Sequence, residues 1–428
     1  MSKTLTAGGA TSLLISILLI SNGPAQAGGA RQGAAGATRY DFTTLLDSRH
    51  DGLQPTRCAA INSFGAVAVT VRDTVSGVTR ITTAQRPNEA PVVVADTTSV
   101  ADFPTFCDNG FSNLPSDPSI NDAGEVAFQG NLRRLTTRAD CATVEQRARR
   151  QGVFLGLGGP LTTIAHTINQ PGGDFIAEFL VADQSVNSVG NVAMVPELDV
   201  TFEHGLFVGS KTGSFDRRFL AGTPTPDGFN FSNISSRPSL TDNGQIAFQS
   251  SLSGTSVSGI FLSNPDGTFK SIVDNTGTFS SVSDPSLNIE GRVAFVGSRF
   301  DENGNQIFSI NTSDGRSLTT VAESAPGGYA SFREPSLNDL GAVVFTAEVR
   351  RDPNLFVTTQ GVFTGPDPRA HKVLQAGDRY EGERVTNVVT CAEALNNRGE
   401  IAMTVFSENP ETFEVRAFVV RASPRRLP

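Results

Sequence analysis

The sequence has no tryptophan and little positive charge, since 34 Lys and Arg against 43 Asp and Glu leave a net charge of -9. A general nucleic-acid binder needs a basic field to hold phosphates, so this balance excludes that class. Long helix-forming runs are scarce, whereas there are 42 glycines and 23 prolines. This composition predicts many short strands joined by tight turns. Because 38% of the residues are hydrophobic, the chain can still bury a core.

Recognisable catalytic motifs are also missing. There is no Gly-x-Ser-x-Gly elbow, no phosphate-binding loop, no Cys-x-x-Cys and no adjacent histidine pair. The four histidines are scattered, at His50, His166, His204 and His371. We therefore expect no catalytic residue, no metal site and no cofactor, and we interpret the chain as a protein without enzymatic activity.

The first residues resemble an export signal. Lys3 precedes the apolar run LLISILLI (13–20), and AQA (25–27) supplies small residues for cleavage. We predict a signal peptide over 1–27 and a flexible linker over 28–39. The apolar run is short for a membrane span, although a retained membrane anchor is the alternative. We expect an exported monomer, in the periplasm, at the cell surface or secreted, with no membrane span after cleavage.

An eleven-residue motif recurs seven times along the chain. Each copy has Asn, or Thr in the fourth copy, followed three positions later by Gly and then by an alternating apolar segment. The spacing of about fifty residues is typical of propeller blades and too long for leucine-rich or ankyrin units. The copies are AAINSFGAVAV (59–69), PSINDAGEVAF (118–128), QSVNSVGNVAM (184–194), PSLTDNGQIAF (238–248), PSLNIEGRVAF (285–295), PSLNDLGAVVF (335–345) and EALNNRGEIAM (393–403).

Each copy predicts two strands joined by a tight turn, because Asn tolerates left-handed conformations and Gly adopts positive φ. Two further apolar strands follow each motif, as in GVFLG (152–156) and LTTIA (161–165). We therefore predict an all-β fold, a seven-bladed β-propeller of four-stranded antiparallel blades over 40–422, with a short tail at 423–428. The last copy has no fourth strand after 417–421, so we expect the N-terminal segment 42–47 to complete the seventh blade.

The motif Asn-x-x-Gly-x-(Val/Ile)-Ala-(Phe/Met) resembles that of the bacterial extracytoplasmic tandem-repeat proteins described by an NxxGxxAF motif. The resemblance covers about the whole chain after the signal, and it implies an exported, repeat-built protein without a defined activity. Such proteins often carry a sorting tail, which this sequence lacks. The motif residues themselves are interpreted as structural.

The propeller topology predicts which of the four cysteines lie near one another. With strands a to d running outward from the axis, the d–a and b–c loops share one face, and the Asn-x-x-Gly turns lie on the other. Cys107 and Cys141 fall on the loop face of blade two, whereas Cys58 and Cys391 precede the inner strands of blades one and seven. We predict Cys107–Cys141 and Cys58–Cys391, although four cysteines allow three connectivities and all four can also stay reduced.

Variable loops on a rigid scaffold commonly carry binding, so we place the candidate site on the loop face. Arg57, Arg237 and Arg333 each precede an inner strand near the channel mouth. Together they could hold a carboxylate or a sulfate. Alternatively, they pair with acidic residues at equivalent positions of other blades, namely Asp117, Asp284 and Glu334.

Three functions follow from these patterns. The first is a binding scaffold for an extracellular protein or glycan. The second is a glycan-processing enzyme, because FREP (332–335) resembles the Phe-Arg-x-Pro motif of sialidases. That resemblance implies an arginine cluster beside a Tyr–Glu pair, with Tyr329 or Tyr380 on the loop face. The third is a structural spacer of the cell envelope without a discrete ligand.

Overall fold

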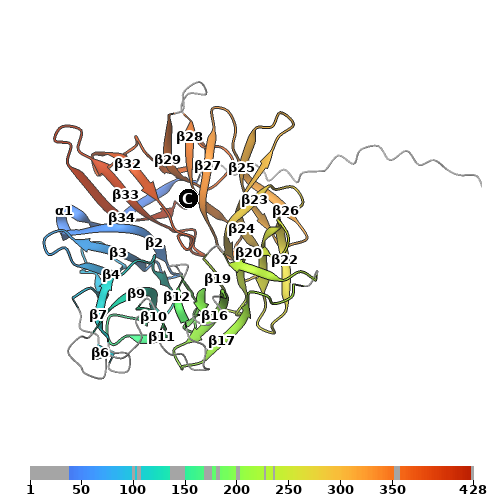
Figure 1. The fold of residues 1–428 in the computed structure, drawn as a ribbon. Helices are drawn as coiled ribbons and strands as arrows, with labels where there is room; N and C mark the ends of the chain where they lie inside the picture. Colours follow the sequence, from blue (N-terminus) through green and yellow to red (C-terminus); the bar gives the residue numbers. More distant parts are fainter. Residues whose placement is uncertain are drawn as a thin grey trace, which may run out of the picture. The chain divides into compact units, whose positions relative to one another are not determined.

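A computed structural model describes residues 38–98, 102–103, 108–134, 150–167, 176–179, 184–198, 203–225, 228–234, 237–350 and 357–425. All of them lie in the compact unit Ala37–Pro428. Seven antiparallel blades follow one another in a circle, in the order of the chain, and the third blade is divided into a four-stranded and a two-stranded sheet (Figure 1). The prediction of a seven-bladed β-propeller is therefore confirmed. Among the described residues, no helix has the length and apolar character needed to cross a membrane.

Within a blade, consecutive strands run antiparallel from the axis outward. Blade one contains β2 (Leu53–Ile61), β3 (Val67–Asp73), β4 (Thr79–Ala84) and β5 (Val92–Asp96). Blade five contains β23 (Ser281–Leu287), β24 (Val293–Phe300), β25 (Gln306–Ser313) and β26 (Leu318–Glu323). Blade six contains β27 (Tyr329–Leu337), β28 (Val343–Arg350), β29 (Thr358–Phe363) and β30 (Lys372–Gln375).

In blades two to four, the inner strand is interrupted. Blade two has β7 (Asp108–Asn113), β8 (Ser119–Ile120), β9 (Val126–Arg134), β10 (Gln151–Gly156) and β11 (Thr162–His166), with β6 (Asp102–Phe103) paired to β7. Blade three has β12 (Ile176–Phe179), β13 (Ser185–Val186), β14 (Asn191–Met194), β15 (Pro196–Leu198), β16 (Gly205–Ser210) and β17 (Phe215–Leu220). Blade four has β18 (Phe231–Ile234), β19 (Ser239–Leu240), β20 (Ile246–Leu252), β21 (Ser258–Ser263) and β22 (Phe269–Asp274).

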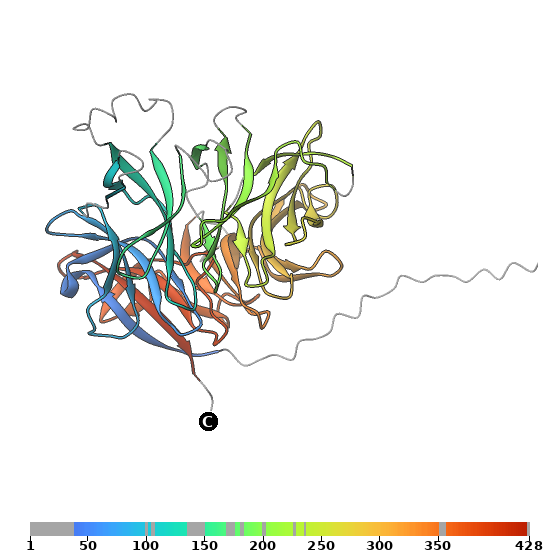
Figure 2. The same cartoon turned by 90° about the horizontal axis from the view of Figure 1, so that it is seen from below.

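Blade seven joins the two ends of the chain. It contains β32 (Glu383–Val389), β33 (Ile401–Glu408), β34 (Val415–Pro424) and β1 (Tyr40–Asp47), with β31 (Arg379–Tyr380) beside β32. The antiparallel pairing of β1 and β34 runs from Tyr40 opposite Pro424 to Asp47 opposite Phe418, and the two strands lie together in both views (Figure 2). The prediction that the N-terminal segment completes the last blade is confirmed. After β1, the short helix α1 (Ser48–Asp51) leads to blade one.

In the b strand, the second strand of each blade counted from the axis, large and small apolar side chains alternate because both faces of the blade are buried. In β9, Val126 and Phe128 pack against residues of blade one, while Ala127 between them packs against blade three. The same division recurs where Ala247 of blade four packs against Phe295 of blade five. A large side chain on one face thus meets a small one from its neighbour, and such interdigitation fills the space between adjacent sheets.

The seven Asn-x-x-Gly turns share one geometry. In every copy, the Gly amide donates to the carbonyl of the Asn or Thr, at 2.9–3.0 Å. The seven glycines have φ between +75° and +82°, a region that side chains rarely adopt. They are Gly65, Gly124, Gly190, Gly244, Gly291, Gly341 and Gly399. The sequence prediction of a repeated tight turn at this position is confirmed.

The motif asparagines also connect neighbouring blades. Nδ2 of Asn121 donates to Asn187 O of the next blade, and Nδ2 of Asn396 donates to Asn62 O across the closure of the ring, both at 3.0 Å. At Thr241, which has no amide, Asn243 donates to Ile289 O instead, at 3.1 Å. The turns of consecutive blades are thereby tied together around the axis.

Candidate binding site at the propeller axis

A hollow of about 230 Å³ lies at the loop-face end of the axis, among blades one, two, six and seven. We call it the axial hollow. Charged and polar side chains dominate its wall, which is formed by Thr56, Arg57, Cys58, Asp117, Arg333, Glu334, Thr346, Gln360, Val389 and Thr390. Two of the three predicted arginines are therefore brought to one hollow.

Arg57 and Arg333 remain accessible in the axial hollow. The guanidinium of Arg57 lies 4.0 Å from Asp117, and its side chain is 42% exposed. That of Arg333 lies 3.7 Å from Glu348, and its side chain is 65% exposed. Ion pairs this open to solvent are weak, so both cations are able to exchange their partners for a ligand.

The alternative prediction, that each arginine pairs with an acidic residue of another blade, is thus confirmed for Arg57, whose partner is Asp117. The partners of the other two arginines differ from the predicted ones. Arg333 pairs with Glu348 of the adjacent strand in its own blade, rather than with a residue of another blade.

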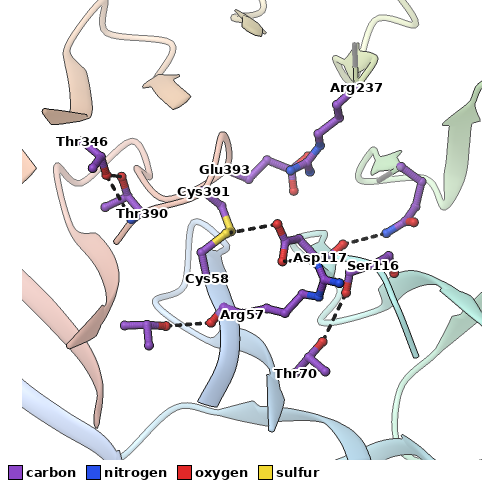
Figure 3. The surroundings of a disulfide bond; sticks show 12 residues. Arg57, Cys58, Thr70, Ser116, Asp117, Arg237, Thr346, Thr390, Cys391 and Glu393 are labelled. Carbon is purple, nitrogen blue, oxygen red and sulfur yellow. Dashed lines mark hydrogen bonds and ion pairs between the residues drawn. A yellow bond between two sulfur atoms is a disulfide. The ribbon is translucent and has the colours of Figure 1, made fainter. Parts of the chain in front are cut away.

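Arg237 has a structural position instead. Its guanidinium lies 2.7 Å from Glu393 of blade seven, and only 14% of its side chain is exposed (Figure 3). Glu393 also accepts a hydrogen bond from Ser185 Oγ of blade three at 2.9 Å. One carboxylate of blade seven therefore holds blades three and four from across the axis, which takes Arg237 out of the predicted arginine cluster.

Glu393 belongs to a segment that lies across the axis, residues 390–394, which we call the axial plug. The Glu393 carbonyl accepts from Ile61 N of blade one at 2.9 Å, and the Ala392 carbonyl accepts from Ser286 Oγ of blade five at 3.4 Å. The hydroxyls of Thr390 and Thr346, from blade six, are 2.9 Å apart. Contacts on several sides hold the plug beneath the axial hollow.

A disulfide between Cys58 and Cys391 fixes the plug to blade one (Figure 3). The Cα atoms are 5.4 Å apart and both residues are buried. The predicted Cys58–Cys391 pairing is confirmed. The other predicted pair, Cys107–Cys141, lies outside the described residues.

Two acidic residues of inner strands, one of them in the wall of the axial hollow, lie at backbone bulges. Glu334 and Asp284 occupy the same position of blades six and five, with φ of +47° and +55°, where the pairing of the inner strands shifts register. Bulges redirect side chains, and positive φ in such residues is strained. Surrounding protein raises the pKa of Asp284, against a smaller opposing effect of the Ser283 hydroxyl. With Asp117 and Glu334 in its wall, the axial hollow carries carboxylates as well as guanidinium groups.

The two predicted tyrosines are not in the axial hollow, which corrects the expectation that they stand beside the arginines. Tyr329 is buried against Phe332, Phe345 and Phe363, and its hydroxyl donates to Gly365 O at 2.8 Å. Burial raises the pKa of that hydroxyl far above its ordinary value.

Tyr380 is likewise buried, in the core of blade seven, with its hydroxyl 2.6 Å from Thr44 Oγ1. Burial is the main cause that raises its pKa to about 12. Both tyrosines are large side chains of blade cores, where their apolar rings are removed from water.

Sequence reasoning missed Glu393 and Ser185 as residues of the axis. A signal was present, because most copies begin with Pro-Ser, whereas the first, third and seventh begin with Ala59-Ala60, Gln184-Ser185 and Glu393-Ala394. Glu393 stands where the common motif has proline, and a carboxylate at this position of the inner strand indicates a distinct role.

A family profile described as a family of unknown function, DUF7453, matches residues 143–417. The comparison with curated proteins finds no match. The resemblance to NxxGxxAF-motif proteins stays a prediction.

Solved structures give distant likenesses. A prolyl endopeptidase is 11% identical at a TM-score of 0.44, and the match covers 89% of this chain and 48% of that one, so the chain spans about half the endopeptidase. An oligogalacturonate lyase in complex with manganese is 10% identical at 0.41, covering 91% and 98%. A subtype N11 neuraminidase-like protein of A/flat-faced bat/Peru is 11% identical at 0.35, covering 92% and 97%. The propeller assignment itself follows from the sheet topology described above.

Proposed function

The chain belongs to DUF7453, a family of unknown function, and we propose that it is an exported, non-enzymatic binding module whose axial hollow takes an acidic group of a glycan. The observation that carries this proposal is the exposure of Arg57 and Arg333 in one hollow. A guanidinium can hold a carboxylate or sulfate with two parallel hydrogen bonds.

The remaining wall suits the hydroxyl-rich part of such a ligand. Asp117 and Glu334 offer acceptors for sugar hydroxyls, while Thr56 and Gln360 offer further polar atoms. The axial plug below the hollow is held by a disulfide and by hydrogen bonds, so the floor is rigid before a ligand arrives. A preformed site loses less conformational entropy on binding.

Export is part of the same proposal. The disulfide between Cys58 and Cys391 suits an oxidising compartment. The signal-like segment 1–27 and the linker 28–39 agree with it. Mass spectrometry of the protein recovered outside the cytoplasm should show a chain that begins at Gly28, and an uncleaved chain retained in the cytoplasm would refute export.

A glycan array probed with residues 28–428 tests the binding proposal. We expect retention on glycans that carry uronate, sialic acid or sulfate, and little retention on their neutral counterparts. A double variant R57A/R333A should lose about tenfold or more in signal, because bidentate charged contacts dominate such recognition.

The matched control is R316A, which removes an exposed arginine from a c–d turn on the opposite face. It should bind like the parent protein. Equal binding of the double variant, or retention on neutral glycans alone, would exclude the axial hollow as an acidic-glycan site.

A further inference from the structure

The face opposite the axial hollow carries exposed apolar side chains in a repeated position. Phe64, Val189 and Leu340 follow the motif Asn by two residues and are 61%, 58% and 78% exposed, and Ile289 follows it by one residue and is 37% exposed. They stand on blades one, three, six and five. Large apolar side chains gathered on one face of a soluble domain commonly mark an interaction surface.

Carboxylates occupy the turns of three blades of the same ring, and one of these blades also carries Leu340. Asp122, Asp242 and Asp339 directly follow the motif residue in blades two, four and six. One oxygen of each accepts a hydrogen bond from the preceding blade, from Ser63 N, Ser188 N and Ile289 N at 2.7–2.9 Å. The carboxylates are therefore held in place around the axis.

These turns surround a hollow of about 180 Å³ whose ionisable lining residues are all acidic, namely Asp122, Asp242, Asp339 and Glu393. Glu393 is paired with Arg237, so the three aspartates give the hollow its negative charge. The cations near these turns are paired with other carboxylates, Arg237 with Glu393, Lys211 with Glu125 and Arg398 with Glu400. The centre of this face is thus acidic and its surroundings are apolar. We call this surface the turn-face ring.

The positions of the three aspartates exclude several kinds of ligand for the turn-face ring. The three aspartates do not approach closely enough to chelate one ion, since the single group of three potential ligand residues within 4.8 Å among the described residues is Cys58, Asp117 and Cys391. A second copy of this chain, stacked face to face, would place acid against acid at the axis. Anionic surfaces would be repelled for the same reason.

We propose that the turn-face ring docks a segment of a partner protein in which a lysine or arginine is flanked by apolar residues. The cationic side chain enters the acidic hollow on the axis, and the flanking residues cover Phe64, Val189, Ile289 and Leu340. Charge complementarity at the centre and apolar contact around it are the usual division of specificity and affinity. This surface is separate from the axial hollow, so either proposal can fail alone.

Selection from a phage-displayed library of random twelve-residue peptides, panned on residues 28–428, provides the test. We expect enriched peptides with Lys or Arg between apolar residues. Fluorescence anisotropy should show that a synthetic copy binds the triple variant D122N/D242N/D339N at least about tenfold more weakly, and that added salt weakens binding to the parent protein. Asn keeps one acceptor oxygen for the backbone amide of the preceding blade. At Asp339 the second oxygen also accepts from Asn397 Nδ2, at 2.7 Å, so D122N/D242N serves as a second variant that leaves this contact intact.

Matched controls come from the opposite face. F64S should weaken peptide binding, whereas F300S, which removes a phenylalanine that is also 61% exposed, should not. D301N changes a turn aspartate of the loop face and should bind like the parent. Melting curves check that each variant folds. Selection without basic enrichment, or unchanged affinity in the triple variant and in F64S, would overturn the proposal.

Discussion

Each motif asparagine makes hydrogen bonds on two sides. Oδ1 of Asn338 accepts from Ala342 N within its own turn at 2.9 Å, and its Nδ2 donates to Asn396 O of the next blade at 3.0 Å. The side chain is buried, so its loss leaves backbone groups without partners in a place that water does not readily reach. This explains at the residue scale why the motif is repeated: every blade needs the same turn and the same connection.

The variant N338A should therefore lower the free energy of unfolding by about 1–3 kcal/mol, the effect of unsatisfied buried polar groups. Urea denaturation followed by circular dichroism measures it. The matched control is N303A, in an exposed b–c turn, which should change the free energy by less than about 0.5 kcal/mol. Equal effects of the two substitutions would show that the asparagine acts only as a turn former.

At the scale of elements, closure depends on β1, whose last residue is held by an ion pair. Nε of Arg416 in β34 donates a hydrogen bond to Asp47 Oδ1 at 2.8 Å, and Nη2 of the same guanidinium donates to Asp47 Oδ2. Burial by itself raises the pKa of the Asp47 carboxyl. Bonds from Arg416 and the Arg49 amide outweigh burial and lower the pKa below its ordinary value of 3.8.

A lowered folded-state pKa means that the stabilisation is complete above pH 3.8 and is lost as the pH falls through the folded-state value. We expect hydrogen-exchange protection of the β1 amides to decrease below pH 3.8, after correction for intrinsic exchange rates. The variant D47N should show lower protection at neutral pH and a weaker acid response. D301N should behave like the parent, and an unchanged acid response in D47N would assign the effect to other groups.

At the scale of the whole molecule, two connections close the ring. The outer one is the pairing of β1 with β34, and the inner one is the disulfide, whose cysteines are 333 residues apart in sequence. Cross-linking so long a loop restricts the unfolded chain strongly, while the folded ring already places the two residues together. The disulfide also fixes the axial plug, so it connects closure of the ring with the floor of the axial hollow.

Replacing both cysteines, as C58S/C391S, should lower the free energy of unfolding by about 2–5 kcal/mol. Denaturation of the oxidised proteins measures this. Glycan binding in the axial hollow should weaken as well, because the plug loses its covalent attachment. A double variant with parental stability would mean that β1 alone closes the ring, and S76A/S256A on exposed loops serves as the neutral control.

Much of the fold was predictable because its signals are local. Asn-x-x-Gly produces the turn, and the alternation after it produces a strand buried on both faces. The unpaired last repeat and segment 42–47 then indicated how the ends meet. Cys58–Cys391 followed, since it requires only that blades one and seven are neighbours. The site was less predictable: Arg57 and Arg333 meet in one hollow, but Tyr329 and Tyr380 look the same in sequence whether their rings face a core or a channel.

By itself, the sequence determined the number of blades, the turn that begins each b strand and the strand that closes the ring, because these depend on neighbours along the chain and on a repeat. The tertiary structure alone decided that Glu393 reaches Arg237 and Ser185 across the axis, and that the aspartates of three turns surround one hollow. Such contacts join side chains from distant blades, and their geometry exists only after the ring has brought all seven inner strands to one axis.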